Sequence, residues 1–137
     1  NLQSHATSNV ANVSQKAALA AVTGDLSAVA QMREAFDRRR LKIVEMLNAI
    51  PGVSCVNPMG AFYVFPNFSA YYGKSFNGQV IEGSVALADY LLSEAKVATV
   101  PGAAFGADAF IRFSFATSMD VIQKGMERIT AALAALR

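Results

Sequence analysis

Residues 110–116 read Phe-Ile-Arg-Phe-Ser-Phe-Ala, and this stretch decides the fold class that the sequence predicts. Large apolar residues recur at every second position, and a period of two predicts a β-strand. The two faces of this strand would carry Ile111, Phe113 and Phe115 on one side, and Phe110, Arg112, Ser114 and Ala116 on the other. Arg112 is out of place in such a strand, because a buried charge without a partner is costly.

The segments around this strand predict a small domain that mixes helices and strands. Apolar periodicity and turn residues predict helices at about 10–22, 25–50 and 84–95 and after Ser118, strands at 53–57, 61–65 and 97–100, and irregular structure at 66–83. We therefore expect an α/β protein of the α+β two-layer kind, with helices covering a small, mostly antiparallel sheet. The helix at 25–50 is long enough to bridge something larger than this core.

Apolar spacing also predicts which side chains of the helices face the core. The expected inward residues are Val29, Met32, Phe36, Ile43, Leu47 and Ile50 in the long helix, Val85, Ala88, Leu91, Leu92 and Ala95 in the next, and Ile122, Met126, Ile129, Leu133 and Leu136 in the last. We expect Asp25 and Ser118 to cap helices, because short polar side chains accept backbone N–H groups there. The first two helices carry apolar faces that the small sheet would not fully cover.

Composition bounds the class of protein. The chain has 137 residues, 53% of them hydrophobic and 16% charged, which predicts one folded domain. A net charge of +2 gives no reason to expect nucleic acid or a membrane as partner. Cys55 is the single cysteine and His5 the single histidine, so we expect a cytoplasmic protein without a multi-histidine metal site. The chain begins without Met or a signal peptide, as a piece of a longer protein would.

Two interpretations of Arg112 are open from the residues alone. Its guanidinium could grip a carboxylate through two parallel hydrogen bonds, or it could reach solvent or pair with a nearby acid. Pattern alone favours the second. The other candidates are weaker: His5 is typical of a solvated side chain, Cys55 of an inert core residue, and Arg38–Arg40 of a solvated helix face. These residues do not form a complete catalytic set.

Several stretches, in this order, resemble the C-terminal part of the fold-type I, pyridoxal-phosphate-dependent aminotransferases, most closely the bacterial aspartate aminotransferase subgroup. They are Gln-Ser-His-Ala-Thr-Ser-Asn at 3–9, Pro-Met-Gly-Ala-Phe-Tyr at 58–63, Val-Pro-Gly at 100–102 with Phe-Gly at 105–106, and Ile-Arg-Phe-Ser-Phe-Ala-Thr-Ser at 111–118. The resemblance covers the whole chain and implies the small domain of that family, with the helix at 25–50 as its interdomain helix.

The resemblance also implies roles for individual residues. Arg112 matches the arginine that binds the substrate α-carboxylate, and Phe62 an aromatic residue that packs near it, although Phe62 also suits a plain core position. Thr7, Ser8 and Asn9 match a loop that reaches the active site of the neighbouring subunit in a homodimer, although they equally suit helix capping. The implied organisation is this loop at 1–9 followed by a single domain at 10–137.

The family's cofactor, pyridoxal phosphate, is held by a lysine, and no lysine here lies in the matching context. We therefore expect the large cofactor-binding domain to be absent from this chain, and the chain alone to be inactive. The implied activity of the full-length protein is amino-group transfer between an amino acid, with aspartate favoured, and a 2-oxo acid. The alternatives are an aromatic-amino-acid or prephenate transaminase, or a non-catalytic module.

Overall fold

The computed structural model describes residues 2–6 and 9–137. The chain divides into two compact units, Asn1–Glu34 and Ala35–Arg137. The boundary falls inside helix α3 (Ser27–Asn48). The domain boundary after residue 9 that the family resemblance implies stays a prediction.

The first unit contains α1 (Leu2–Ala6), α2 (Asn12–Thr23) and the beginning of α3. The sequence predicted a loop through residues 1–9, whereas a single helical turn occupies residues 2–6. Thr7 and Ser8 lie outside the described residues. Asn9 is exposed at a bend just before α2.

The cap predicted at Asp25 is confirmed. Its carboxylate accepts the backbone N–H of Ser27 at 2.9 Å and the Ser27 hydroxyl at 2.6 Å. These two hydrogen bonds lower the pKa of Asp25. The apolar faces in this unit remain largely exposed, as expected, and no residue of α2 is buried. Val29 and Met32, predicted to face the core, are exposed as well.

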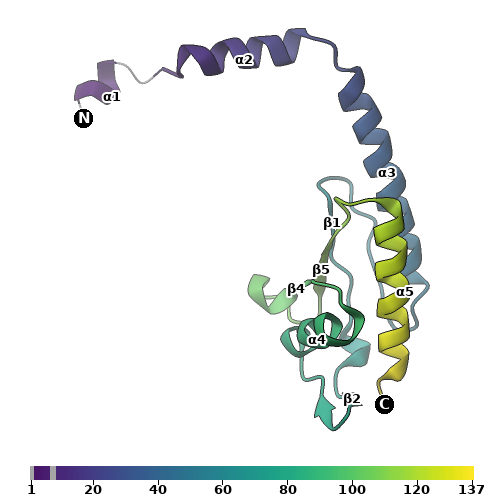
Figure 1. The fold of residues 1–137 in the computed structure, drawn as a ribbon. Coiled ribbons are helices and arrows are strands. Elements are labelled where there is room, and N and C mark those ends of the chain that lie inside the picture. Colours follow the sequence, from purple (N-terminus) through teal and green to yellow (C-terminus); the bar gives the residue numbers. More distant parts are fainter. Residues whose placement is uncertain (1, 7–8) are drawn as a thin grey trace. The chain divides into compact units, whose positions relative to one another are not determined.

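The second unit is built on a three-stranded sheet in the order β1-β5-β4 (Figure 1). The central strand β5 (Ile111–Ser114) pairs antiparallel with β1 (Tyr63–Val64) and with β4 (Val100–Pro101). Tyr63 lies opposite Ser114, and Val100 lies opposite Arg112. The small antiparallel sheet predicted from the alternation at 110–116 is confirmed, with shorter strands.

Helices cover one face of this sheet, as predicted. The core gathers Ile111, Phe113 and Phe115 of the β5 region with Ile43 and Leu47 of α3, and with the apolar stripe of α5 (Met119–Ala135). The five inward residues predicted for the last helix are all buried. Ser118 caps this helix by accepting the backbone N–H of Val121 at 3.3 Å. Figure 1 shows α5 beside the C-terminal half of α3.

The predicted helix at 84–95 consists of α4 (Ser84–Tyr90) followed by a π-helical turn, η2 (Leu91–Ala95). Ala88, Leu91 and Ala95 are buried as predicted, but Val85 and Leu92 are exposed. The inward stripe of α4 contains Ser84, Leu87 and Ala88 instead. Ser84 belongs to it because its hydroxyl has hydrogen-bond partners in the interior, so burial leaves no polar atom unpaired.

The strand predicted at 53–57 is reduced to one bridge, between Ser54 and Asn67. The backbone of Cys55 is bonded by a side chain instead of a neighbouring strand. The amide of Asn48 accepts the Cys55 N–H at 2.8 Å and donates to its carbonyl at 3.0 Å. One asparagine at the end of α3 therefore replaces two ladder bonds.

The segment at 66–83 is more ordered than predicted. It holds a short 3₁₀ helix, η1 (Ser69–Tyr71), and a hairpin of β2 (Ser75–Phe76) and β3 (Gln79–Val80). Asn77 and Gly78 form the turn and both have positive φ, at 49° and 81°. An Asn-Gly pair is a strong hairpin signal, and it could have been recognised from the sequence.

Candidate functional site

Arg112 lies on the face of β5 that the helices do not cover. Its neighbours in the strand, Ile111 and Phe113, are 0% and 5% exposed, whereas Arg112 is half-buried and Ser114 is exposed. The strict alternation along the strand therefore places a guanidinium on the outer face without opening the core.

Two aromatic rings hold the guanidinium of Arg112. Its Cζ atom lies 4.5 Å from the ring centroid of Tyr63 and 4.7 Å from that of Phe105. Both distances are within the range of cation–π attraction. Among the described residues, Arg112 forms no ion pair and no side-chain hydrogen bond. The second interpretation was that Arg112 pairs with a nearby acid or reaches solvent. Such a pair is not observed in the described part of the chain, and the side chain is half-buried.

Further aromatic rings extend this arrangement. Phe65 stacks on Phe110 with centroids 5.1 Å apart and meets Phe105 edge-on at 6.0 Å. Tyr63, Phe65 and Phe105 are 36%, 37% and 50% exposed. We refer to Tyr63, Phe65, Phe105 and Phe110 with Arg112 as the aromatic face. A half-buried cation among half-exposed rings can bind a planar anion that also has an apolar part.

Phe62, the second predicted substrate-binding residue, lies beside this face. Its ring is 42% exposed and packs on Tyr63 with centroids 4.4 Å apart. Tyr63, and not Phe62, makes the ring contact with Arg112. The backbone of Phe62 accepts the N–H of Phe115 at 2.9 Å, which ties it to the end of β5. A direct role of Phe62 in binding stays a prediction.

Sequence reasoning missed Tyr63 and Phe105 as partners of Arg112. Tyr63 could have been found, because it alternates with Val64 in a strand and would share a face with Arg112 in the sheet. Phe105 ends the 3₁₀ helix η3 (Gly102–Phe105), and a loop residue has no periodicity from which to predict its direction. This short helical turn therefore contributes a ring to the site.

Arg40 provides a contrast with Arg112. It pairs with Asp37 at 2.6 Å and also reaches Asn57, so its charge has local partners. Arg39 lies over the Phe36 ring at 5.1 Å. The interpretation of Arg38–Arg40 as a solvated face is therefore wrong for Arg39 and Arg40, which are half-buried.

Cys55 has the character of an inert core cysteine, as predicted. It is 8% exposed, and burial raises the pKa of its thiol to about 11. A thiol with so high a pKa is a poor nucleophile near neutral pH. His5 is exposed on α1.

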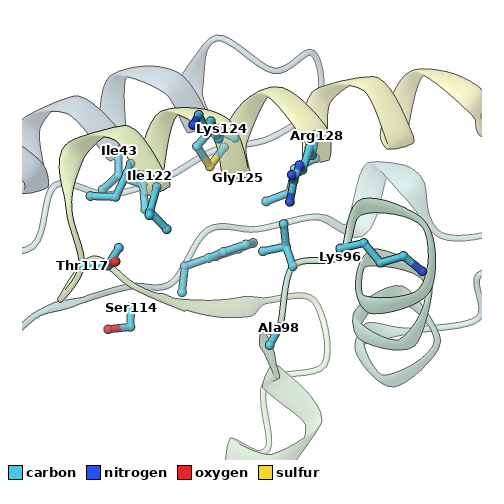
Figure 2. A pocket seen from close by; sticks show the side chains of 14 residues that line it. Ile43, Lys96, Ala98, Ser114, Thr117, Ile122, Lys124, Gly125 and Arg128 are labelled. Carbon is cyan, nitrogen blue, oxygen red and sulfur yellow. The ribbon is translucent and has the colours of Figure 1, made fainter.

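A separate pocket of about 470 Å³ lies between α5 and the sheet (Figure 2). Ile122 and Arg128 of α5 line one side, and Ala98 and Ser114 line the other. Its lining contains basic and apolar residues but no Asp, Glu, His or Cys, and it does not include Arg112. The pocket therefore lacks an acid–base pair and is distinct from the aromatic face.

Three lysines make side-chain contacts away from the aromatic face. Lys42 donates to Glu45, Lys96 donates to the carbonyl of Ser93, and Lys74 lies over the Tyr71 ring. The residues of the aromatic face suit a substrate carboxylate, but without one of these lysines they do not make a complete site for a cofactor aldehyde.

In the described ranges, acidic, His and Cys side chains form no group of three or more that could hold a metal ion. No helix in this part of the chain is long and apolar enough to cross a membrane.

Comparisons with known proteins agree on one family. The family model of aminotransferase class I and II matches residues 1–129. Among curated proteins, an aspartate aminotransferase of Streptomyces avermitilis is 55% identical over 94% of this chain and 32% of its own length. An aspartate/prephenate aminotransferase of Cereibacter sphaeroides is 46% identical over 98% of this chain and 34% of its own length.

The fold comparison gives the same result. The crystal structure of an aspartate aminotransferase from Rhizobium meliloti matches with a TM-score of 0.89 and 41% identity, over 99% of this chain and 34% of that one. The chain spans about a third of the length of the relatives that it matches. With the α+β fold and the match over nearly its whole length, this chain belongs to the class I and II aminotransferase family.

Proposed function

We propose that this chain is the part of a pyridoxal-phosphate-dependent aminotransferase that binds the substrate carboxylate and closes the active site. The main support for this proposal is Arg112. Its guanidinium is half-buried, contacts two aromatic rings and has no acidic partner among the described residues. Amino acids and 2-oxo acids share an α-carboxylate, and a planar guanidinium binds a carboxylate through two parallel hydrogen bonds. One arginine can therefore serve both half-reactions.

The residues of the aromatic face, and Phe62 beside it, have distinct parts in this proposal. The N–H groups of Arg112 hold the carboxylate, which orients the substrate for reaction. Tyr63 and Phe105 restrain the guanidinium plane, and Phe62 and Phe65 exclude water as the site closes. Pyridoxal phosphate, when bound, would carry the amino group between the two substrates. The lysine that binds it, and most of its site, would belong to a large domain outside this chain.

Substitution of Arg112 in the full-length enzyme tests this role. Arg112→Lys keeps the charge but loses the paired N–H donors, and Arg112→Ala loses both. We expect kcat/KM to fall at least about 100-fold for Arg112→Ala, because a charged, paired contact is lost, and to fall less for Arg112→Lys. Arg128→Ala removes an exposed arginine from the separate pocket and is the matched control. Unchanged kcat/KM in Arg112→Ala would refute the proposal.

Aspartate is the proposed amino donor. The proposed acceptor is a 2-oxo acid such as 2-oxoglutarate, and prephenate is the alternative acceptor. The relatives support both: one is named an aspartate aminotransferase and others aspartate/prephenate aminotransferases. An assay with aspartate and either 2-oxoglutarate or prephenate separates the two. If aspartate reacts with 2-oxoglutarate and not with prephenate, prephenate is excluded as the acceptor.

We also propose a cytoplasmic homodimer in which Thr7, Ser8 and Asn9 reach the active site of the partner subunit. The sequence match at 3–9 supports this arrangement. Mixing subunits that carry Arg112→Ala with subunits that carry Asn9→Ala would test it. If sites are shared, hybrids regain part of the activity that each parent has lost; if they are not, mixing yields only the average of the two.

The expectation that this chain cannot catalyse by itself, which the proposal shares with the alternative of a non-catalytic module, can be tested with the cofactor. If the proposal is right, the 137-residue chain mixed with pyridoxal phosphate loses the cofactor's visible absorbance on gel filtration. Retained absorbance with amino-group transfer would show that the chain holds a complete site by itself.

A further inference from the structure

The two rings that hold Arg112 are positioned by different means. Tyr63 lies in β1, and its place is set by strand pairing opposite Ser114. Phe105 lies at the end of η3, outside the sheet, and is half exposed. A ring on a surface turn stays 4.7 Å from a guanidinium only if the turn itself is held.

Ser84 ties both sides of this turn to the start of α4. Its hydroxyl accepts the backbone N–H of Ala103 at 3.0 Å and donates to Asp108 Oδ1 at 2.6 Å. Its backbone N–H donates to the same oxygen at 3.0 Å. Ala103 precedes Phe105 and Asp108 follows it, so one residue fastens the turn on either side. Ser84 itself is fully buried, whereas its partners Ala103 and Asp108 are exposed, so these bonds fasten a surface turn to the interior.

The carboxylate of Asp108 is the acceptor at the centre of this anchor. The hydrogen bonds from Ser84 lower the pKa of Asp108, so the side chain stays ionised near neutral pH. Its backbone carbonyl also accepts the hydroxyl of Tyr72. Asp108 is thereby joined to two other segments of the second unit.

Two glycines allow the close approach on which the anchor depends. A Cβ on Gly83 would lie 2.6 Å from Asp108 Oδ2. A Cβ on Gly102 would overlap the carbonyl oxygens of Ala107 and Phe110. The Asp108 side chain therefore lies directly against the backbone of Gly83, and Gly102 lies directly against the backbone of Ala107 and Phe110, which leaves the turn little freedom to shift.

We propose that Ser84 and Asp108 are positioning residues for carboxylate binding, which hold the ring of Phe105 on the guanidinium of Arg112. This inference rests on the proposed function of Arg112. A long arginine side chain has many rotamers, and contact of its guanidinium with two rings removes many of them before the substrate arrives. The N–H edge is then turned toward the carboxylate in advance, which strengthens binding by preorganisation.

The test compares variants of the full-length enzyme. In Ser84→Ala both side-chain bonds are lost, and we expect KM for the amino acid and the 2-oxo acid to rise about threefold to tenfold, with kcat within about twofold. Asp108→Ala should match it. Asp108→Asn keeps Oδ1 as an acceptor, so its KM should lie closer to wild type than that of Asp108→Ala.

A control separates positioning from general loss of stability. Ser118→Ala removes the cap of α5, a bond of similar kind that lies beyond the other end of β5 from the turn. We expect it to lower the melting temperature without raising KM. A KM increase in Ser118→Ala equal to that in Ser84→Ala would overturn the inference.

Phe105→Leu keeps the test decisive if Ser84→Ala does not fold, because Phe105 is half exposed. It should raise KM as much as Ser84→Ala, and neither change should raise KM further in an Arg112→Lys background. Additive effects in that background, or normal KM in Phe105→Leu, would overturn the positioning role while leaving Arg112 as the carboxylate site. Normal KM in Arg112→Lys and Arg112→Ala would instead overturn the proposed function.

Discussion

The two faces of β5 use the same kind of side chain for opposite purposes. On the inner face, Phe113 and Phe115 are 5% and 1% exposed and fill the core. On the outer face, Phe105 is 50% exposed and lies over Arg112, and Phe65 is 37% exposed and packs edge-on against Phe105. A phenylalanine therefore stabilises the fold where it is dry, and shapes a binding surface where it lies half in water beside a charge.

Truncation of an inner ring should have the largest effect. Phe115→Ala leaves a cavity beside Phe36, whose ring lies 6.2 Å away, and we expect the free energy of unfolding to fall by about 3–5 kcal/mol. Urea unfolding of the chain measures the loss. Phe105→Ala is the matched change on the outer face and should cost less than about 1 kcal/mol, because the ring already contacts water. Equal losses would show that the two faces do not differ as described.

The reactivity of Cys55 measures how well water is excluded from the helix-covered side of the sheet. Its thiol pKa is raised from 9.0 to about 11 by burial, and the thiolate is the form that reacts. At pH 8 the native chain should react with iodoacetamide about 100-fold more slowly than the urea-unfolded chain, before any protection by sterics. Similar rates in the two states would mean that water reaches this side of the sheet.

The same shift predicts a dependence of stability on pH. Because the pKa of Cys55 is higher in the folded state, the unfolded state loses this proton first as pH rises. The contribution to stability is complete below the unfolded pKa and is lost as pH rises through the folded value of about 11. The decline above pH 9 should be shallower in Cys55→Ala, as measured by urea unfolding at each pH.

A substitution at Gly125 tests whether the core-facing side of α5 has space for a larger side chain. A Cβ there would meet Val97 Cγ2 at 4.0 Å, an ordinary contact distance. We expect Gly125→Ala to raise the melting temperature, with a gain of about 0.5–1 kcal/mol from helix propensity. A loss of stability would indicate that this side is packed more tightly than the contact distance suggests.

Removal of the charge from the outer face should have the smallest effect on folding. Arg112→Met retains most of the apolar stem and loses the contacts with Tyr63 and Phe105, so we expect stability to change by less than about 1 kcal/mol. Urea unfolding gives the value. A loss as large as that of Phe115→Ala would mean that Arg112 serves the fold and not a ligand.

The regular parts of this fold could be predicted, because their signals are local. The alternation at 110–116 predicted both faces of β5, and the stripe from Ile122 to Leu136 predicted the buried side of α5. The two-layer class followed from these elements. The prediction for α4 failed at Val85 and Leu92, because the burial of Ser84 and the π-helical turn at Leu91–Ala95 change the inward side. Neither feature has a period that can be read from the chain.

The sequence by itself determined that Arg112 would lie on the strand face opposite Phe113 and Phe115, because side chains along a strand alternate regardless of the rest of the fold. Only the tertiary structure decided what surrounds it. Phe105 reaches Arg112 from a turn that is held by Ser84, and the serine lies 21 positions earlier in the chain. Such contacts join segments without a common period, so they depend on how loops and helices pack and not on any local pattern.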